Sequence, residues 1–378
     1  MSAPARRLGV GAAVVDGALV PGDVAVTNGV VEAVGLGPAG RGLAVPGLVD
    51  LQVNGYGGAD LQGGDAQDWA RAGAALLRDG VTAFVANIIT AAIGDVERCL
   101  QQARTWTANP ARLDAGTTPL ARLLGCHLEG PFLSPSRAGM HPTELLQEPD
   151  AALLDRWIGL GPVSGLTIAP ELAGAVEMIK GARARGLLVA LGHTAATAAQ
   201  AHAGFDAGAS TVTHLLNGMG PLTAREPGCA GTALARPDVT VQLICDGVHL
   251  APETVTVAMA AASGRWVLVT DAMSAAGCGD GSYHFGVAPV SVQQGCARLA
   301  DGTLAGSVLT MAEAVRNVVR CGATTVDAVN AATLRPAALL GLDHPRLRPG
   351  ERADLVVLDE ELAVTQVLLA GRSVRDAP

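Results

Sequence analysis

The chain of 378 residues is 49% hydrophobic, only 3% aromatic and 16% charged, and it contains 48 glycines and 21 prolines. This composition argues against a disordered protein, and the length allows either one large domain with a small one or two domains of ordinary size. A net charge of −9 without a basic run disfavours a nucleic-acid partner, and no apolar stretch reaches the roughly 18 residues of a membrane-spanning helix.

The two ends of the chain predict short β-strands. Near the start, apolar segments alternate with typical turn pairs, at residues 10–15, 24–27 and 30–34. A similar pattern returns only at residues 353–358 and 364–369. We therefore predict a small discontinuous β-sandwich domain, built from residues 1–45 and 346–378, beside a catalytic domain over residues 46–345.

Between these ends, apolar strands alternate with amphipathic helices. Apolar residues at helical spacing predict helices that follow Asp65 and Thr310 and end near Gly80 and Gly322. Eight near-continuous apolar segments are predicted strands, at residues 48–53, 81–89, 123–128, 166–169, 187–191, 211–213, 239–244 and 266–270. Eight such strands, each followed by a helical segment, are typical of an α/β fold of the (β/α)8 TIM-like barrel type.

Polar residues follow the carboxyl ends of these strands, where barrels of this type carry their chemistry. Glu129, His193 and His214 supply one oxygen and two nitrogen ligands, which suit a divalent metal ion and leave a position for water. A single buried histidine is more often a hydrogen-bonded core residue, but three such residues at strand ends favour a metal site. Asn87 and Glu171, at the second and fourth strands, could equally be solvated loop residues.

Four further residues are candidates for catalysis or binding. Asp271 ends the last strand and could move a proton to and from the reacting groups, although an aspartate in such a turn also commonly caps a helix. His141 and His249 lie on predicted loops, where function and accident are equally common. Arg225 could bind a phosphate, but a surface salt bridge with Glu226 or another neighbour is the more common role of an isolated arginine.

An ordered set of motifs supports a family resemblance. The motifs are PGLVD at residues 46–50, QVNG at 52–55, HLEGPF at 127–132, GHT at 192–194, THL at 213–215, REPG at 225–228 and TDA at 270–272. With them, the chain from about Val10 to Val374 resembles the N-acetylglucosamine-6-phosphate deacetylases of the amidohydrolase superfamily. The resemblance implies hydrolysis of the acetamido group of N-acetyl-D-glucosamine 6-phosphate to D-glucosamine 6-phosphate and acetate, in amino-sugar catabolism or recycling.

The resemblance also implies roles for individual residues. Glu129, His193 and His214 would hold the catalytic metal, Asp271 would be the proton shuttle, and His141 would polarise the amide carbonyl. The residues expected to bind the substrate are Met140, His141, Asn217, Gly218, Arg225, Asp246, His249, Leu304, Ala305 and Gly306. Arg225 matches a residue that reaches the phosphate bound by the neighbouring subunit, so the resemblance implies a homodimer.

The sequence departs from most amidohydrolases after the first barrel strand, where Gln52 and Asn54 replace a His-x-His pair. Amides are poorer metal ligands than imidazoles, so we predict one divalent ion per subunit, with Gln52 at most bonding to it through water. Zinc is our first expectation, with Fe²⁺, Co²⁺ and Mn²⁺ as alternatives. Gly218 stands where the family often has alanine, and we expect backbone contacts there to survive.

Other functions are compatible with the same motifs. The chain could be an N-acetylgalactosamine-6-phosphate deacetylase or another amidohydrolase, because the orientation of one sugar hydroxyl cannot be read from the sequence. It could also be an inactive barrel that binds a sugar phosphate. Seven scattered cysteines without a C-x-x-C pair favour a reduced, cytoplasmic setting, and Asp16 interrupts the apolar run that could otherwise suggest a signal peptide.

Overall fold

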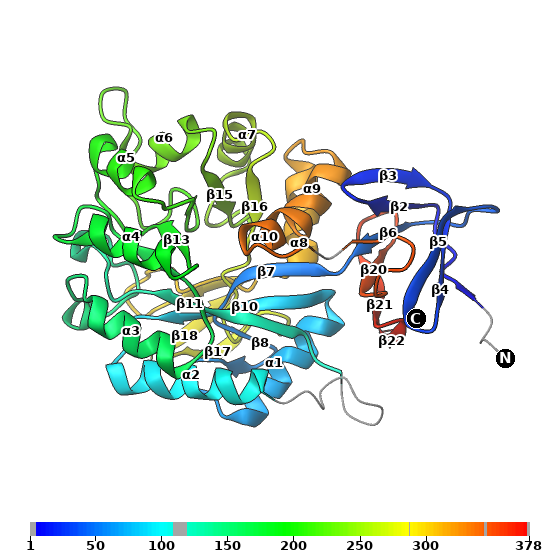
Figure 1. Cartoon of the computed structure of the whole chain (residues 1–378), viewed down its shortest axis with the longest axis horizontal. Coiled ribbons are helices and arrows are strands. Elements are labelled where there is room, and N and C mark those ends of the chain that lie inside the picture. Colours follow the sequence, from blue (N-terminus) through cyan, green and yellow to red (C-terminus); the bar gives the residue numbers. More distant parts are fainter. Residues whose placement is uncertain (1–4, 109–118, 287, 344–345, 376–378) are drawn as a thin grey trace.

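The computed structural model describes residues 5–108, 119–286, 288–343 and 346–375, and its centre is a parallel sheet curled into a barrel (Figure 1). Eight strands form this sheet, in the order β16-β15-β14-β13-β12-β11-β10-β7. Their bounds are β7 (Leu48–Val53), β10 (Val81–Ile89), β11 (Arg122–Glu129), β12 (Val163–Ile168), β13 (Leu188–Leu191), β14 (Thr211–Val212), β15 (Thr240–Leu243) and β16 (Trp266–Leu268). The predicted barrel is therefore confirmed, and each predicted strand is present within a few residues of its expected bounds.

Helices follow the barrel strands in turn. They are α1 (Ala66–Arg78), α2 (Ile93–Thr107), α3 (Ala151–Leu160), α4 (Ala175–Ala184), α5 (Ala198–Asp206), α6 (Gly228–Ala235), α7 (Pro252–Ala261), α8 (Met311–Arg320), α9 (Thr325–Ala331) and α10 (Leu334–Leu339), with the 3-10 turns η2 (Pro135–Arg137) and η3 (Thr143–Leu145). None of the helices in the described ranges is long and apolar enough to cross a membrane.

The two helices predicted from apolar spacing begin at the expected caps. The side chain of Asp65 accepts hydrogen bonds from the backbone of Gln67 and Asp68 at the start of α1. Thr310 and Glu313 form a capping box at the start of α8, in which each side chain bonds to the other residue's backbone N–H. These caps satisfy N–H groups that have no partner inside the helix.

The barrel closes where its first and last strands meet. Val53 and Ala272 form a parallel bridge across this seam. Beside it, Oδ2 of Asp50 accepts a 2.5 Å hydrogen bond from the hydroxyl of Thr270, and Oδ1 faces the backbone N–H of the same residue at 3.3 Å. Asp50 is completely buried, and burial raises its pKa to about 6 even though these hydrogen bonds favour the carboxylate.

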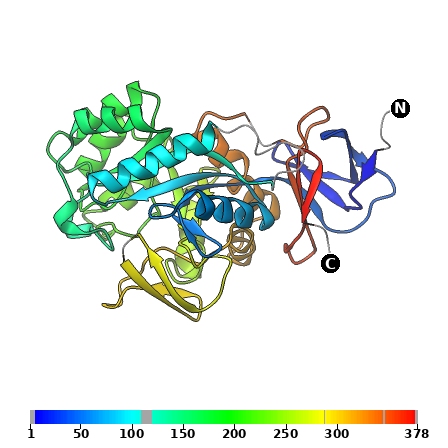
Figure 2. The ribbon, with the colours of Figure 1, turned by 90° about the horizontal axis from the view of Figure 1, so that it is seen from below.

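Strands from both chain ends form two sheets at one side of the barrel, where Figures 1 and 2 show the ends together. One sheet has the order β22-β21-β20-β6-β2-β3 and the other β1-β4-β5. The strands are β1 (Arg6–Arg7), β2 (Ala12–Val15), β3 (Ala18–Pro21), β4 (Asp23–Thr27), β5 (Val30–Leu36), β6 (Leu43–Pro46), β20 (Leu355–Leu358), β21 (Val364–Leu369) and β22 (Arg372–Arg375). The antiparallel pairing of β20 with β6 joins the two ends, as predicted.

These sheets enclose a small hydrophobic cluster that includes Val10, Val24, Leu355 and Leu368. The division into domains at 45/46 and 345/346 remains a prediction. Its limits include residues 1–4, 344–345 and 376–378, which lie outside the described residues.

An antiparallel sheet that the sequence did not predict follows the last barrel strand. It consists of β17 (Gly281–Phe285), β18 (Ala288–Gln293) and β19 (Cys296–Arg298), and it projects from the barrel in Figure 2. Phe285 packs with Ile89, Met273 and Ala305 in a separate hydrophobic cluster. This packing brings the sheet to the carboxyl end of β10. Near the same end, β8 (Gly55–Tyr56) and β9 (Ala59–Asp60) form a two-stranded hairpin.

Candidate active site

A cavity of about 230 Å³ lies at the carboxyl ends of the barrel strands. Its wall is formed by Ile89, Glu129, Gly139, Met140, His141, His193, His214, Asn217, Gly218, His249, Asp271, Phe285, Thr303, Leu304 and Gly306. Most of the residues predicted for the site thus line one cavity, although they come from segments more than 170 positions apart in the chain. In (β/α)8 barrels, active sites lie at the end formed by the carboxyl ends of the strands, which is where this cavity is found.

Glu129, the last residue of β11, lies against two histidines. Its Oε1 is 2.9 Å from Nε2 of His193 and 2.9 Å from Nε2 of His214, and all three side chains are buried. Ligand atoms of the three residues lie within 4.8 Å of one another. Burial opposes ionisation of Glu129, but the hydrogen bonds with the two imidazoles outweigh it and hold the pKa of Glu129 well below its usual range. The structure therefore brings the three predicted metal ligands together.

The surroundings of His193 fit a metal ligand. Its Nδ1 lies 2.8 Å from the backbone carbonyl oxygen of Arg137, which can only accept, so Nδ1 carries a proton and donates it. A ring with only this proton has a lone pair at Nε2, so the 2.9 Å contact with Oε1 of Glu129 is favourable only where a second proton on the ring, or a cation, lies between the two atoms. Metal-bound histidines usually donate their other N–H to such a carbonyl. With its two nitrogen donors and one oxygen donor, the site fits a divalent metal ion.

Three residues of the site have left-handed backbone conformations. The φ angles are 46° at His193, 26° at His214 and 51° at Asp271. Such conformations cost about 1–3 kcal/mol each for residues other than glycine, and they concentrate at functional sites. Gly218, at φ 59°, packs against the ring of His193 so closely that a Cβ would lie 2.9 Å from Nδ1. Glycine at this position therefore lets the loop approach the imidazole.

Asp271 follows β16 and is held by two amides. Its Oδ1 accepts hydrogen bonds from Nδ2 of Asn54 at 2.8 Å and from Nε2 of Gln52 at 3.1 Å. Burial, followed by the negative charge of Glu129, raises the pKa of Asp271 well above its usual range. A carboxylate with a raised pKa accepts a proton more readily, which suits a general base. The alternative that Asp271 caps a helix is wrong, because the next regular element is β17.

His141 lies between η2 and η3 and its side chain is buried at the cavity wall. Its Nδ1 faces both the backbone N–H of Thr90 at 3.3 Å and the hydroxyl of Thr90 at 2.9 Å. Burial lowers the pKa of His141 to about 3. A neutral ring that accepts at Nδ1 carries its proton on Nε2, where it can donate to a substrate oxygen.

His249 is oriented by an aspartate on its own loop. Its Nδ1 lies 2.7 Å from Oδ2 of Asp246, and Oδ1 of Asp246 accepts from the backbone N–H groups of Val248 and His249, each at 2.8 Å. Burial opposes ionisation of Asp246, but these hydrogen bonds outweigh burial and lower its pKa. The bond with the His249 ring has the largest lowering effect. His249 lines the cavity, whereas Asp246 does not line it and contacts the ring of His249 through Oδ2.

The remaining residues predicted to bind substrate are divided between the cavity and its surroundings. Met140, Asn217, Gly218, Leu304 and Gly306 line the cavity. Ala305 does not line it; its side chain is fully buried in the cluster that includes Phe285. These positions are the expected ones for contacts with a ligand, and the contacts themselves stay a prediction.

Arg225 does not line the cavity of its own subunit. It lies on the exposed segment of residues 221–226, and within the described part of the chain no hydrogen bond or ion pair involves it. The alternative of a salt bridge with Glu226 or another neighbour is not seen among the described residues, and Oε1 of Glu226 accepts from the backbone N–H groups of Ala198 and Gly228.

Gln52 and Asn87 are buried near the base of the cavity, and both bond to Glu129. Nε2 of Gln52 lies 3.0 Å from Oε2 of Glu129, and Nδ2 of Asn87 lies 2.5 Å from the same atom. Asn87 is therefore not a solvated loop residue. Glu171, by contrast, follows β12 in a turn, where its carboxylate accepts from the backbone N–H of Ala195. The predicted bond from Gln52 to a metal through water stays a prediction.

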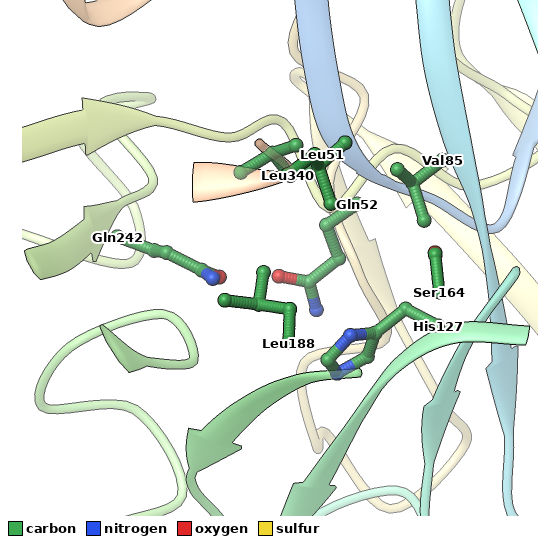
Figure 3. A pocket seen from close by; sticks show the side chains of 8 residues that line it. All are labelled: Leu51, Gln52, Val85, His127, Ser164, Leu188, Gln242 and Leu340. Atoms are coloured by element: carbon green, nitrogen blue, oxygen red, sulfur yellow. The ribbon is translucent and has the colours of Figure 1, made fainter. Parts of the chain in front are cut away.

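Beneath Gln52 lies a second, much smaller cavity of about 10 Å³ inside the barrel. The side chains of Gln52 and Gln242 point toward each other across it, with the ring of His127 beside them (Figure 3). Nε2 of His127 is 2.7 Å from the hydroxyl of Thr167, and burial lowers the pKa of His127 to about 4. His127 is thus a neutral, hydrogen-bonded residue of the barrel interior.

Four residues of the cavity wall escaped the sequence analysis as site residues: Ile89, Gly139, Phe285 and Thr303. Ile89 and Phe285 are apolar, and apolar residues at strand ends resemble the ordinary core. Thr90, which orients His141, was missed for a different reason. Its partner is 51 residues further along the chain, and no local pattern signals that contact.

Comparison with known proteins identifies a family and several relatives. A model of the amidohydrolase family matches residues 43–374. The chain is 36% identical over 335 residues to the N-acetylgalactosamine-6-phosphate deacetylase of Escherichia coli O157:H7, covering 87% of each chain. It is also 36% identical over 335 residues to the N-acetylglucosamine-6-phosphate deacetylase of Bacillus subtilis (strain 168), covering 86% of this chain and 83% of the relative.

The similarity extends to solved structures. A mutant of N-acetyl-D-glucosamine-6-phosphate deacetylase from Mycobacterium smegmatis, in complex with N-acetyl-D-glucosamine-6-phosphate, superimposes with a TM-score of 0.91 at 36% sequence identity. The match covers 99% of this chain and 100% of that one.

Proposed function

Because this chain belongs to the amidohydrolase family, we propose that it hydrolyses the acetamido group of N-acetyl-D-glucosamine 6-phosphate to D-glucosamine 6-phosphate and acetate. The observation that carries the proposal is the cluster of Glu129, His193 and His214 beside Asp271 in one cavity. The similarity to deacetylases over most of the chain supports the substrate class. Amino-sugar catabolism or recycling is the context in which such a reaction is useful.

The proposed site holds one divalent ion per subunit, bound by Glu129, His193 and His214, and zinc is our first choice. A divalent ion bound there would lower the pKa of a water ligand and polarise the acetamide carbonyl. The amides of Gln52 and Asn54 donate to carboxylates, which leaves one well-defined group of strong ligands and supports a single ion. Iron, cobalt and manganese ions suit the same donors.

Asp271 and His141 perform the proton transfer and the charge stabilisation. As water attacks the acetyl carbon, Asp271 removes a proton from it, and the N–H of Nε2 in His141 donates to the carbonyl oxygen as that atom gains negative charge. The carbon–nitrogen bond then breaks, and Asp271 returns the proton to the departing nitrogen. The products are the free amine and acetic acid, which releases the second proton of the water to solvent to become acetate, and Asp271 regains its original state.

His249 and Arg225 would bind the phosphate, with Arg225 supplied by a second subunit. Support for this homodimer comes from the exposed segment that carries Arg225, since it also carries Leu222, which is 50% exposed. Val248, beside His249, is 40% exposed. An exposed leucine three residues from an arginine that has no partner among the described residues supports an interface at this segment. Phosphate held away from the reacting bond supplies binding energy that orients the amide.

N-acetyl-D-galactosamine 6-phosphate is the second candidate substrate. The Escherichia coli relative named for that substrate is as similar to this chain as the Bacillus subtilis relative named for the glucosamine compound. The two sugars differ in the orientation of one hydroxyl, so a single contact could decide between them. A barrel that only binds sugar phosphate is disfavoured because the ligand cluster and Asp271 are all present.

We further propose that residues 46–345 form the catalytic domain and that residues 1–45 and 346–378 form the small β domain. A cytoplasmic location is proposed from the seven cysteines, which are scattered and unpaired.

Acetate release from four substrates tests the proposed function. Zinc-loaded protein is given N-acetylglucosamine and N-acetylgalactosamine, each with and without the 6-phosphate. We expect N-acetylglucosamine 6-phosphate to have the highest kcat/KM and both unphosphorylated sugars to have a much lower one. A higher value for the galactosamine phosphate would replace the proposed substrate by the second candidate. Equal rates with and without phosphate would overturn the phosphate site.

A further inference from the structure

Two carboxylates and three amides form a closed hydrogen-bonded group, here called the amide clasp, at the base of the cavity. The amides belong to Gln52, Asn54 and Asn87, and the carboxylates belong to Glu129 and Asp271. Within the clasp, Nδ2 of Asn87 also donates to Oδ1 of Asn54 at 2.8 Å. Gln52, Asn54 and Asn87 are each at least 98% buried as whole residues, so water does not compete for these bonds.

In each carboxylate, the amides of the clasp bond to one oxygen and leave the other oxygen free of amide contacts. Oε2 of Glu129 accepts from Gln52 at 3.0 Å and from Asn87 at 2.5 Å, while Oε1 faces the two histidines. Oδ1 of Asp271 accepts from Gln52 and from Asn54, and no described residue donates to Oδ2. The oxygen held by amides fixes the carboxylate, and the other oxygen is available for chemistry.

The carboxylates determine which way the amides point. Within the described residues, Oε1 of Gln52 and Oδ1 of Asn87 are buried and have no hydrogen-bond partner. A buried carbonyl oxygen without a partner destabilises the fold, so some stronger interaction must set these orientations. Reversing either amide would place its oxygen against Oε2 of Glu129, and two acceptors in contact repel.

Strand register explains why Asn87 can reach both partners. Asn87 lies in β10 opposite His127 of β11, and Ile89 lies opposite Glu129. Asn87 is therefore two residues before the Glu129 level and on the strand between β7 and β11. From there one amide nitrogen contacts Glu129 on one neighbouring strand and Asn54, just after the other strand.

We propose that Asn87 is a positioning residue that orients Glu129 for metal binding and, through Asn54, orients Asp271 for proton transfer. Asn54 bonds to Asp271 and not to Glu129, so its own effect is limited to the orientation of Asp271. Neutral N–H donors at this point let two carboxylates lie close together without a second cation. The proposal rests on the proposed function for its catalytic half, whereas the effect on metal binding depends only on the ligand cluster.

The test replaces single amides by leucine, which is similar in size and cannot donate. Zinc is titrated into metal-free Asn87→Leu and Asn54→Leu proteins in competition with a chelating dye, and kcat and KM are measured with N-acetyl-D-glucosamine 6-phosphate. Substitutions just outside a metal's ligands typically cost about 10- to 100-fold in affinity or activity. We expect such a loss of both zinc affinity and kcat in Asn87→Leu, and of kcat alone in Asn54→Leu, with KM little changed in both.

Gln242→Leu is the matched control, because it removes another buried amide of the barrel interior that contacts neither carboxylate. Its zinc affinity and kcat should equal those of the wild type. Thermal unfolding verifies that each variant is folded, and Asn87→Ala is measured beside Asn87→Leu in case leucine does not fit.

Two results would overturn the proposed role of Asn87. One is wild-type zinc affinity in folded Asn87→Leu and folded Asn87→Ala. The other is an equal loss of zinc affinity in Asn54→Leu, Asn87→Leu and Gln242→Leu. If wild-type protein releases no acetate from any sugar phosphate, the proposed function fails, and the zinc titrations still decide whether Asn87 orients Glu129.

Discussion

The backbone N–H of Thr90 points at Nδ1 of His141 across 3.3 Å, although the two residues are 51 positions apart. An N–H can only donate, so Nδ1 must accept and the proton of the neutral ring lies on Nε2. With its pKa lowered to about 3, His141 stays neutral throughout the physiological range. Nε2 is thus a permanent hydrogen-bond donor at the wall of the cavity, a suitable partner for the oxygen of a carbonyl under attack.

Replacing His141 by alanine should slow the chemical step. Loss of one donor to a developing oxyanion costs about 10²–10³ in kcat in enzymes where this has been measured. We expect a decrease of that order in His141→Ala, with zinc content unchanged because the three ligands remain. Steady-state acetate release together with metal analysis checks this. An unchanged kcat would exclude His141 as a donor to the transition state.

Replacing Asp271 by asparagine should separate metal binding from turnover. The amide cannot accept a proton from water, and general acid–base catalysis contributes roughly 10²–10⁴ to rates. We expect Asp271→Asn to retain zinc and to lose nearly all turnover. The measurements are zinc per subunit and acetate release, each compared with wild-type protein. A variant that still deacetylates well would remove Asp271 from its role.

Replacing Arg225 should weaken binding of the phosphorylated sugar. A hydrogen bond to a charged group is worth about 1.5–3 kcal/mol, so Arg225→Ala should raise KM about tenfold or more and leave kcat nearly unchanged. Mixed dimers test whether the arginine acts across subunits. Unfolding and refolding Arg225→Ala together with Asp271→Asn should restore about a quarter of wild-type activity at low substrate, because half of the dimers then contain one complete site. If mixing restores nothing, Arg225 does not act in a neighbouring site.

The buried Asp50 predicts a pH dependence of stability. Its pKa is about 6 in the folded chain, above the usual value for aspartate, so the folded state holds a proton that the unfolded state releases. The bound proton stabilises the folded state fully below the usual pKa of aspartate, 3.8, and this stabilisation is lost as the pH rises through about 6. The difference between the folded and unfolded pKa values corresponds to roughly 3 kcal/mol in the free energy of unfolding. Asp50→Asn lacks this titration.

Chemical denaturation at pH 4 and at pH 7 measures the effect. The free energy of unfolding of wild-type protein, relative to Asp50→Asn, should fall by about 2 kcal/mol between these two pH values, because the unfolded state is still partly protonated at pH 4. A constant difference between the two proteins across this range would show that Asp50 does not change its proton binding on folding.

Much of the fold could be predicted because parallel barrel strands are buried on both faces and read as continuous apolar runs. Residues 81–89 form such a run and are β10 in the structure. The sheet of β17, β18 and β19 could not be predicted in this way. Val290 and Val292 are buried while Ser291 and Gln293 between and beside them are exposed, so its strands contain few consecutive apolar residues.

In the site, likewise, some residues could be predicted from the sequence and others could not. Glu129, His193 and His214 could be identified because the ends of parallel strands meet at one edge, whatever the detailed register. The amide clasp depends on the register itself, which places Asn87 between two neighbouring strands. No feature of the sequence near Asn87 indicates that its amide reaches Asn54, 33 residues earlier, and Glu129, 42 residues later.

The most direct test of the central claim is to measure both products from N-acetyl-D-glucosamine 6-phosphate with metal-free and zinc-loaded protein. Proton NMR follows acetate, and an amine-reactive dye follows D-glucosamine 6-phosphate. The account predicts equal amounts of acetate and amine from the zinc-loaded protein, and neither product from the metal-free protein. Protein that carries zinc on every subunit and releases no acetate, or metal-free protein that is fully active, would contradict it.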